Sequence, residues 1–392
     1  MTEKISSKFS RQTGEFLYKL VRAAINDEPA PSLPEDCTWQ EVFNLANHNS
    51  ISVLAYYGML KSPDKPDEML SNYWKKAVYA QAARSVQFDV MLEQLYSAME
   101  KADIEYLPIK GALIKHLYPK QEMREMSDVD ILYRIPTDEE RLPGGLSQKT
   151  MQKLMDEMGA ESLTDKGMVD AFWIKPTLLF EMHRDFLGPD QKDFDYYHQI
   201  WDRAFSSDSS LPHHKSVSLE EQYVLMLRHS FKHFQNRGCG PREIFDCYLF
   251  NKCHKGNLNW AAVENLLKQM NMVEYEAMLK RLGQIVFENL KPTSSDTELL
   301  DRFMQAGTYG TIDNSVENEL KRKEEEGLSR QQARLQYIKD RLILDPEFLK
   351  TQFPFFYKHP SLRGLLLIYR IFRGLTTGRD ALLREARALK EK

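Results

Sequence analysis

Hydrophobic positions at helical spacing dominate residues 8–101. Apolar side chains recur there every three or four positions, and the longest such stretch covers 67–101, which is the repeat of an amphipathic helix. The prolines of EPAPSLPED, at 28–36, separate the first helix from the next, because proline has no backbone N–H to donate within a helix. The pattern predicts an all-helical N-terminal unit over residues 1–101.

Short alternating runs replace the helical repeat over residues 102–195, as is typical of strands. Lys110 and Gly111 follow the first run and begin a brief helix that Pro119 ends. A longer helix is expected at 147–159. Strands interleaved with helices on this scale predict a compact core of mixed α/β structure around a small sheet, so the fold class is α+β. The strands are expected at 104–109, 127–134, 171–176 and 177–183.

The helical repeat returns after residue 195 and predicts a C-terminal helical region over 196–392. The run KRKEEE within it is typical of a solvated helix face. The last segment, 361–391, is amphipathic and locally basic, and we interpret it as a solvated face or as a docking face for an acidic partner. The helices are expected at 218–236, 240–252, 259–270, 273–291 and 315–343.

Composition restricts the classes of partner. The formal net charge of -4 over 392 residues argues against binding nucleic acid or a membrane surface through the charge of the whole protein. The N-terminus lacks the apolar core of a signal peptide, and LLLIY at 365–369 is too short to span a bilayer. Four cysteines provide no disulfide framework in a chain of this length. We therefore expect a soluble, cytoplasmic protein.

Two carboxylates interrupt the expected strand in REMSDVDILY, at 124–133. Strand alternation places Asp128 and Asp130 on one face and apolar side chains such as Val129 and Ile131 on the other. Two neighbouring like charges are destabilising unless water or a cation screens them. The pair therefore indicates either a solvated strand end or a site for a divalent metal.

A third acid lies in the expected strand TLLFEMH, at 177–183. Its alternation places Glu181 and His183 together, opposite Phe180 and Met182. If this strand lies beside the aspartate strand, Glu181 faces the same side as the two aspartates, and three carboxylates then meet the need of divalent ions for several oxygen ligands. His183 is a candidate for the acceptor side of the site, and it is equally interpretable as a structural hydrogen-bonding group, a ligand or a proton carrier.

Taken together, IKGALIKHLYP, Arg124, SDVDILY and FEMHRDF resemble an uncharacterised bacterial nucleotidyltransferase family of the polymerase-β-like nucleotidyltransferase superfamily. The resemblance covers residues 104–185 well and extends more weakly to about 250. It implies that Asp128 and Asp130 hold Mg²⁺ or Mn²⁺ on the triphosphate of an NTP. Glu181 would complete the metal site nearer the acceptor hydroxyl, or act as general base.

The loop before the first core helix departs from the superfamily pattern, which has Gly-Ser or Gly-Gly where this chain has Lys110-Gly111. Gly111 still allows backbone N–H groups to approach a phosphate, and Lys110 would add a positive charge. The planar guanidinium of Arg124 is suited to clamping a phosphate. The alternative for Lys110 and Arg124 is a surface ion pair with Glu122 or Glu125.

Two helices after the core supply candidates for the acceptor side of the site. His229 and His233 are four residues apart, as are Arg242 and Asp246, so each pair shares a helix face. The family that the chain resembles has comparable helices after its core. A structural zinc site is the alternative, but the spacing fits no short paired-ligand motif. The residues available to such a site are the two histidines with Cys239, Cys247, Cys253 and His254.

The expected function is a metal-dependent nucleotidyltransferase. It would move a nucleoside monophosphate from Mg·NTP, most simply ATP, to a hydroxyl of a small molecule, a sugar or a protein. The alternative is a non-catalytic protein that keeps the fold and binds a nucleotide or a partner. A template-directed polymerase or tRNA-modifying enzyme is disfavoured, because the net charge of -4 supplies no basic track for nucleic acid.

Overall fold

The structure is a computed structural model that describes most of the chain. Its contacts divide the chain into two compact units, Met1–His229 with Pro241–Thr308, and Ser230–Gly240 with Tyr309–Lys392. We describe each unit by itself. The residues that the structure describes are 9–164, 167–189, 191–206, 208–308, 310–342, 349, 353–376, 385 and 388–389.

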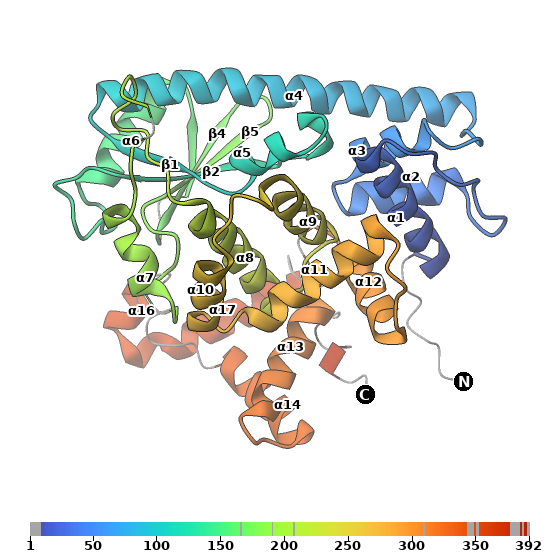
Figure 1. The fold of residues 1–392 in the computed structure, drawn as a ribbon. Coiled ribbons are helices and arrows are strands. Elements are labelled where there is room, and N and C mark those ends of the chain that lie inside the picture. Colours follow the sequence, from blue (N-terminus) through green and yellow to red (C-terminus); the bar gives the residue numbers. More distant parts are fainter. Residues whose placement is uncertain are drawn as a thin grey trace. The chain divides into compact units, whose positions relative to one another are not determined.

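One five-stranded sheet lies in the first unit, in the order β1-β2-β5-β4-β3 (Figure 1). The central pair, β2 and β5, is parallel, and the other neighbours are antiparallel. A mixed sheet among many helices confirms the predicted α+β class. The strands are β1 (Glu105–Pro108), β2 (Asp128–Arg134), β3 (Glu161–Thr164), β4 (Val169–Ile174) and β5 (Leu178–His183).

Four strands overlap the predicted runs, with β4 two residues earlier than expected at 171–176, and β3 was not predicted. Its sequence, ESLT, has one apolar residue and therefore no alternation to detect. The strand exists because β4 offers it an antiparallel edge, with Ser162 opposite Phe172. The helix expected at 147–159 forms as α6 (Leu146–Glu157).

The long helix expected at 67–101 forms as α4 (Glu68–Lys101) and supplies part of the core beneath the sheet. Its buried side chains, among them Phe88 and Leu95, join one hydrophobic cluster with Val129, Ile131 and Phe180 from β2 and β5. Figure 1 shows α4 running along the sheet and on past the N-terminal helices. The first unit therefore contains both the predicted N-terminal helical unit and the predicted core.

The N-terminal helices begin at side-chain caps. Thr38 forms a capping box with Glu41 at the start of α2, and Ser10 caps α1 through the backbone N–H of Thr13. The helices α1 and α3 approach closely at Gly58, where an added Cβ would lie 2.0 Å from the Leu20 carbonyl oxygen. These helices are α1 (Arg11–Asn26), α2 (Trp39–His48) and α3 (Ser52–Met59).

The later helices of the first unit follow the predicted order, with two additions, of which the first is the short helix α7 (Phe194–His198). The helix α12 (Ser294–Ala306) was not predicted; its start is a capping box between Thr293 and Asp296. The helix α8 begins in this unit and continues into the second. The predicted helices form as α8 (Leu219–Asn236), α9 (Arg242–His254), α10 (Trp260–Gln269) and α11 (Val273–Glu288).

In the second unit, the single helix predicted at 315–343 is wrong. Two helices, α13 (Ile312–Glu325) and α14 (Arg330–Leu342), form instead. Gly327, with φ of 95°, turns the chain between them. Val316, Leu320, Ala333 and Tyr337 hold the pair together.

The predicted basic segment at 361–391 begins as α17 (Arg363–Thr376). Most of the segment after Thr376 lies outside the described residues, so the predicted solvated or docking face stays a prediction. Within the parts of the chain that the structure describes, no helix combines the length and the apolar character needed to cross a membrane.

Candidate functional site

The parallel register of β2 and β5 places Asp130 beside Glu181, and Leu132 beside His183. The sequence left open whether these strands are neighbours, and the structure places them together. The apolar residues of the opposite faces, such as Val129 and Phe180, are fully buried in the core. Alternation therefore gathers the polar side chains of both strands on the other face.

Asp130, Glu181 and His183 form the one group of three or more potential metal ligands found among the described residues. One ligand atom from each lies within 4.8 Å of the others. His183 Nε2 is 2.8 Å from Asp130 Oδ1 and 3.7 Å from Glu181 Oε2. Asp128, two residues before Asp130, stands outside this group.

Arg84 of α4 fixes the starts of the two strands, and no motif in the sequence indicated this residue. Its Nη2 donates to the Ser127 carbonyl at 2.8 Å and to the Thr177 carbonyl at 2.9 Å. These residues immediately precede β2 and β5. A single guanidinium thus bridges the two chain segments that lead into the carboxylates.

Lys110 forms an ion pair with Asp130 and lies in a turn with φ of 53°. With ψ of -123° the residue lies in a sparsely populated region, which costs on the order of 1–3 kcal/mol and requires the surrounding structure to hold it. The Ile109 N–H donates to the Asp130 carbonyl at 3.1 Å and fixes the entry to the turn on β2. Lys110 then precedes the short helix α5 (Gly111–Ile114).

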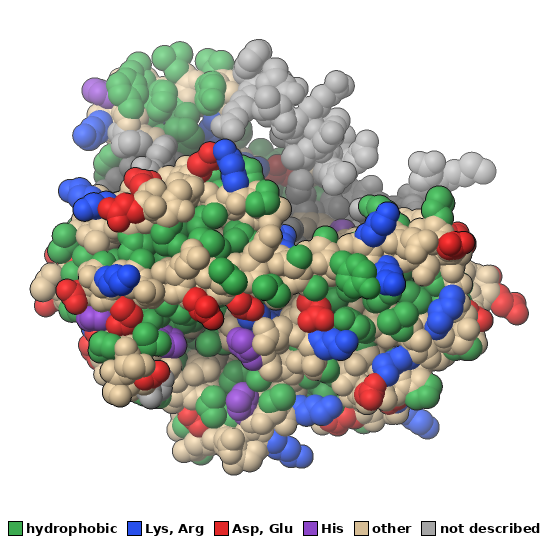
Figure 2. Space-filling model, turned by 90° about the horizontal axis from the view of Figure 1, so that it is seen from above, with side chains coloured by type: hydrophobic (Ala, Val, Ile, Leu, Met, Phe, Trp, Pro, Cys, Tyr) green, Lys and Arg blue, Asp and Glu red, His purple; other side chains and the backbone are tan. Residues whose placement is uncertain are grey.

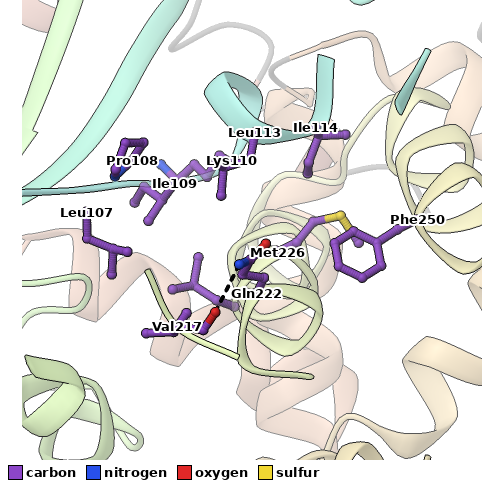
Figure 3. A pocket seen from close by; sticks show the side chains of 11 residues that line it. Leu107, Pro108, Ile109, Lys110, Leu113, Ile114, Val217, Gln222, Met226 and Phe250 are labelled. Atoms are coloured by element: carbon purple, nitrogen blue, oxygen red, sulfur yellow. Dashed lines mark hydrogen bonds between the residues drawn. The ribbon is translucent and has the colours of Figure 1, made fainter. Parts of the chain in front are cut away.

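A small pocket borders the same turn (Figure 3). Its volume is about 20 Å³, which is room for a single water molecule. Gln222 donates from Nε2 to the Val217 carbonyl at 3.0 Å along one wall. The other walls are mainly apolar and include Leu107, Leu113, Met226 and Phe250.

The charges of the site shift three carboxyl groups in different directions. Burial raises the pKa of Asp130, but Lys110, the hydrogen bond with His183 and the charge of His229 outweigh it and hold this pKa well below its usual range. Burial and the charge of Asp130 raise the pKa of Asp128. Burial, with the charges of Asp130 and Asp128, raises the pKa of Glu181 to about 7. Burial and mutual repulsion thus oppose the ionisation of Asp128 and Glu181, while Lys110 and His183 favour that of Asp130.

Arg124 is bound to Asp246 of α9. Its Nη2 lies 2.8 Å from Asp246 Oδ2 and its Nε 3.1 Å from Oδ1, while the Tyr118 hydroxyl donates to Oδ1 at 2.7 Å. A Cβ at Gly111 would lie 2.7 Å from Arg124 Nη1. Glycine at this position therefore lets the guanidinium reach the start of α5.

The alternative surface pairs of Lys110 and Arg124 with Glu122 or Glu125 are wrong. Glu122 instead accepts a hydrogen bond from the Tyr57 hydroxyl at 2.9 Å, and Glu125 accepts one from the Val53 N–H at 2.8 Å. Sequence proximity suggested these pairs, whereas the fold turns the acids toward α3 and the cations toward Asp130 and Asp246.

The residues predicted for the acceptor side lie in different places. His229 is near enough to Asp130 for its charge to lower the pKa of that carboxyl. Arg242 donates from Nη1 to the Glu125 carbonyl at 2.9 Å, whereas Asp246 binds Arg124. His233 belongs to the second unit, because the division falls directly after His229. The alternative zinc site is absent from the described residues, and none of the four cysteines is in a disulfide.

The sequence matches a known protein family. The family described as uncharacterised nucleotidyltransferase matches residues 35–287, which is more than half of the chain. No curated protein matches. A solved structure, of an antigenic nucleotidyltransferase-like protein from Paracoccidioides brasiliensis, is 14% identical over 51% of this chain and 96% of its own, with a TM-score of 0.28. On the family match, the chain belongs to the uncharacterised nucleotidyltransferase family.

Proposed function

We propose that this protein transfers a nucleoside monophosphate from an NTP, most simply ATP, to a hydroxyl of a small molecule, a sugar or a protein. The observation that carries the proposal is the pairing of Asp130 with Glu181 across two parallel strands, with Asp128 close enough to raise the pKa of Glu181. Acids that burial and mutual repulsion perturb in this way are typical of functional sites.

The donor set fits a hard divalent cation such as Mg²⁺ or Mn²⁺. Asp130 and Glu181 offer carboxylate oxygens within 4.8 Å of each other, and oxygen is the ligand type that these ions prefer. Asp128 would add a third carboxylate from the same face of β2. When bound, the metal would neutralise triphosphate charge and lower the pKa of the attacking hydroxyl.

Lys110 would supply the fixed positive charge of the site. Its ammonium group pairs with Asp130 in this structure, and a cation on Asp130 would release it toward the phosphates of an NTP. The backbone at Gly111 and the guanidinium of Arg124 would lie beside those phosphates. Arg124 would act while still held by Asp246, through Nη1, the atom nearest to Gly111.

Glu181 would complete the metal site nearer the acceptor hydroxyl, or alternatively accept the proton of that hydroxyl as general base. In the second role the hydroxyl oxygen forms a bond to the α-phosphorus, the bond from this phosphorus to the pyrophosphate oxygen breaks, and the proton moves to the Glu181 carboxylate. Without a cation on this carboxylate its pKa is raised to about 7, which suits a general base at neutral pH. The hydrogen bond between His183 and Asp130 would keep the neighbouring carboxylate in place.

The proposal is tested with each of the four α-³²P-labelled NTPs, Mg²⁺ or Mn²⁺ and a mixture of cell metabolites. We expect one NTP to give labelled product together with released pyrophosphate. The variant Asp128→Asn/Asp130→Asn should lose the product and keep its circular dichroism spectrum. Asp156→Asn, a change at an exposed acid of α6, is the matched control. Full transfer by the double variant would refute the proposal.

A non-catalytic nucleotide- or partner-binding protein is the second candidate. The ion pair between Lys110 and Asp130 favours it, since an ammonium group neutralises Asp130 without a metal. This candidate predicts that no NTP gives labelled product. Titration calorimetry with NTP and Mg²⁺ then distinguishes a nucleotide-binding protein from a partner-binding one, because only the first would release or absorb heat.

A further inference from the structure

The solvent-facing side of α4 carries a row of exposed positions, opposite the side chains that the helix buries in the core. We call this row the seam. Positions spaced alternately by three and four residues along this side are all exposed, from Met69 to Ser97. At its centre the seam is apolar, with Tyr79 62%, Val86 62% and Val90 48% exposed, and with the exposed Ala83 between them. Figure 2 looks onto the side where Figure 1 places α4 and shows hydrophobic side chains along it.

This spacing is the heptad repeat of a coiled coil. Ala83 and Val90 are separated by seven residues, as are Tyr79 and Val86, so they form the two rows that a partner helix would contact. Branched side chains at exposed positions add nothing to the stability of a lone helix. An exposed apolar seam of this kind marks an interaction surface.

The charges at the two ends of the seam identify the partner. Lys76 lies on the seam before the apolar centre and Glu93 lies on it after the centre, both exposed. An antiparallel copy of the same helix, with its twofold axis between Arg84 and Ser85, places Lys76 of each copy opposite Glu93 of the other. The same axis packs Tyr79 against Val90 and Ala83 against Val86.

Every layer in that arrangement pairs one heptad row with the other, as antiparallel coiled coils require. A parallel pair would instead bring Lys76 onto Lys76 and Glu93 onto Glu93, and like charges across an interface cost several kcal/mol. The seam is therefore complementary to itself in one direction only, and this kind of self-complementarity is what a twofold homodimer needs.

We propose that this protein forms a homodimer in which α4 packs antiparallel against α4 of a second copy. The dimer leaves the buried side of α4 on the sheet, so it requires no rearrangement of the carboxylate site. The inference is independent of the proposed transferase activity.

Light scattering coupled to size-exclusion chromatography tests the dimer across a range of concentrations of the full chain. The mass should rise to twice 45.9 kDa. Lys76→Glu and Glu93→Lys each place like charges at both ends of the seam, and each should raise the dimer dissociation constant by about tenfold or more. The double variant Lys76→Glu/Glu93→Lys restores opposite charges and should restore the dimer.

Two further variants serve as controls. Ala83→Arg places one arginine side chain of each copy next to the twofold axis, and their size and like charge should abolish the dimer. Lys19→Glu, at an exposed position of α1, should leave the dimer unchanged. A cooperative thermal unfolding transition and an unchanged circular dichroism spectrum of the monomeric variants would show that they fold. A monomer at every concentration overturns the proposal, as does a dimer that is indifferent to Ala83→Arg. If the double variant Lys76→Glu/Glu93→Lys does not dimerise more tightly than each single variant, the antiparallel arrangement is wrong.

Discussion

Asp130 and Glu181 are neighbours on adjacent strands, yet their pKa values shift in opposite directions. Asp130 forms an ion pair with Lys110 and a hydrogen bond with His183, and both hold its pKa low despite burial. Glu181 is left with the repulsion of two aspartates and with burial, so its pKa is about 7. Environment, and not residue type, thus sets the pKa values of these two acids apart.

The pH dependence of stability should follow from Glu181. Its pKa rises from 4.5 to about 7 on folding, so the folded state holds this proton more tightly. The resulting stability is complete below pH 4.5 and is lost as the pH rises through about 7. With the side chain 32% exposed, solvent screening reduces the loss to about 1–2 kcal/mol.

Glu181→Gln should remove this loss of stability between low and high pH. Urea unfolding of the metal-free protein at pH 5 and pH 8 gives the free energy of unfolding at each pH. The difference between the two values should be smaller for the variant than for the wild type. Glu157→Gln, at a 69% exposed side chain of α6, should behave like the wild type. An unchanged pH dependence in Glu181→Gln would contradict the shifted pKa.

The sequence was informative about individual site residues but not about their partners. Alternation predicted which side chains of β2 and β5 share a face. It could not predict that Lys110 would pair with Asp130 or Arg124 with Asp246, because those pairs join residues 20 and 122 positions apart. Such contacts depend on tertiary structure, which local patterns do not encode.

At the scale of elements, the pair Arg124–Asp246 joins α9 to the segment between α5 and β2. Both side chains are at least nine-tenths buried, so removing one partner leaves the other charge buried and unpaired. Asp246→Ala should therefore lower the free energy of unfolding by about 3–5 kcal/mol. Glu264→Ala, which breaks an exposed pair with Lys268, should change it by less than about 1 kcal/mol. Equal effects in chemical denaturation would argue against a structural role for the buried pair.

The packing of α1 on α3 depends on a missing side chain at Gly58. An added Cβ would lie 2.0 Å from a backbone oxygen of α1, and backbone cannot give way as a side-chain end can. Gly58→Ala should lower the melting temperature and cost about 1–3 kcal/mol or more. Gly256→Ala, where nothing lies within 4 Å, should be neutral. A Gly58→Ala protein as stable as the Gly256→Ala protein would contradict this packing.

Elements with a strong periodic pattern were predictable, and those defined by contacts or caps were not. The bounds of α4 were predicted to within one residue, because the row of apolar side chains that the helix buries is long. The edge strand β3 has a weak apolar pattern. The helix α12 buries Leu300, Phe303 and Met304 at helical spacing, so its pattern was present in the sequence and was overlooked. The break between α13 and α14 rests on one glycine inside a charged run, and helical periodicity continues across it.

At the scale of the whole molecule, the proposed division into 1–101, 102–195 and 196–392 remains a prediction based on pattern. By contacts, the helices before and after the sheet belong to the same unit as the sheet. The sheet, α4 and α9 all contribute residues that fix the carboxylates or the cations next to them. A site assembled from elements so far apart in sequence forms only when the first unit folds as one body.

Quantitative transfer of α-³²P-labelled NMP in the presence of Mg²⁺ tests the proposed function most directly. The rate should fall by about a hundredfold or more in Asp130→Asn and in Glu181→Gln, and it should be unchanged in Asp156→Asn. Chelation of the metal should abolish transfer by the wild type. Transfer at the wild-type rate by Asp130→Asn, or without any divalent cation, would contradict the assignment of the chemistry to the β2 and β5 carboxylates.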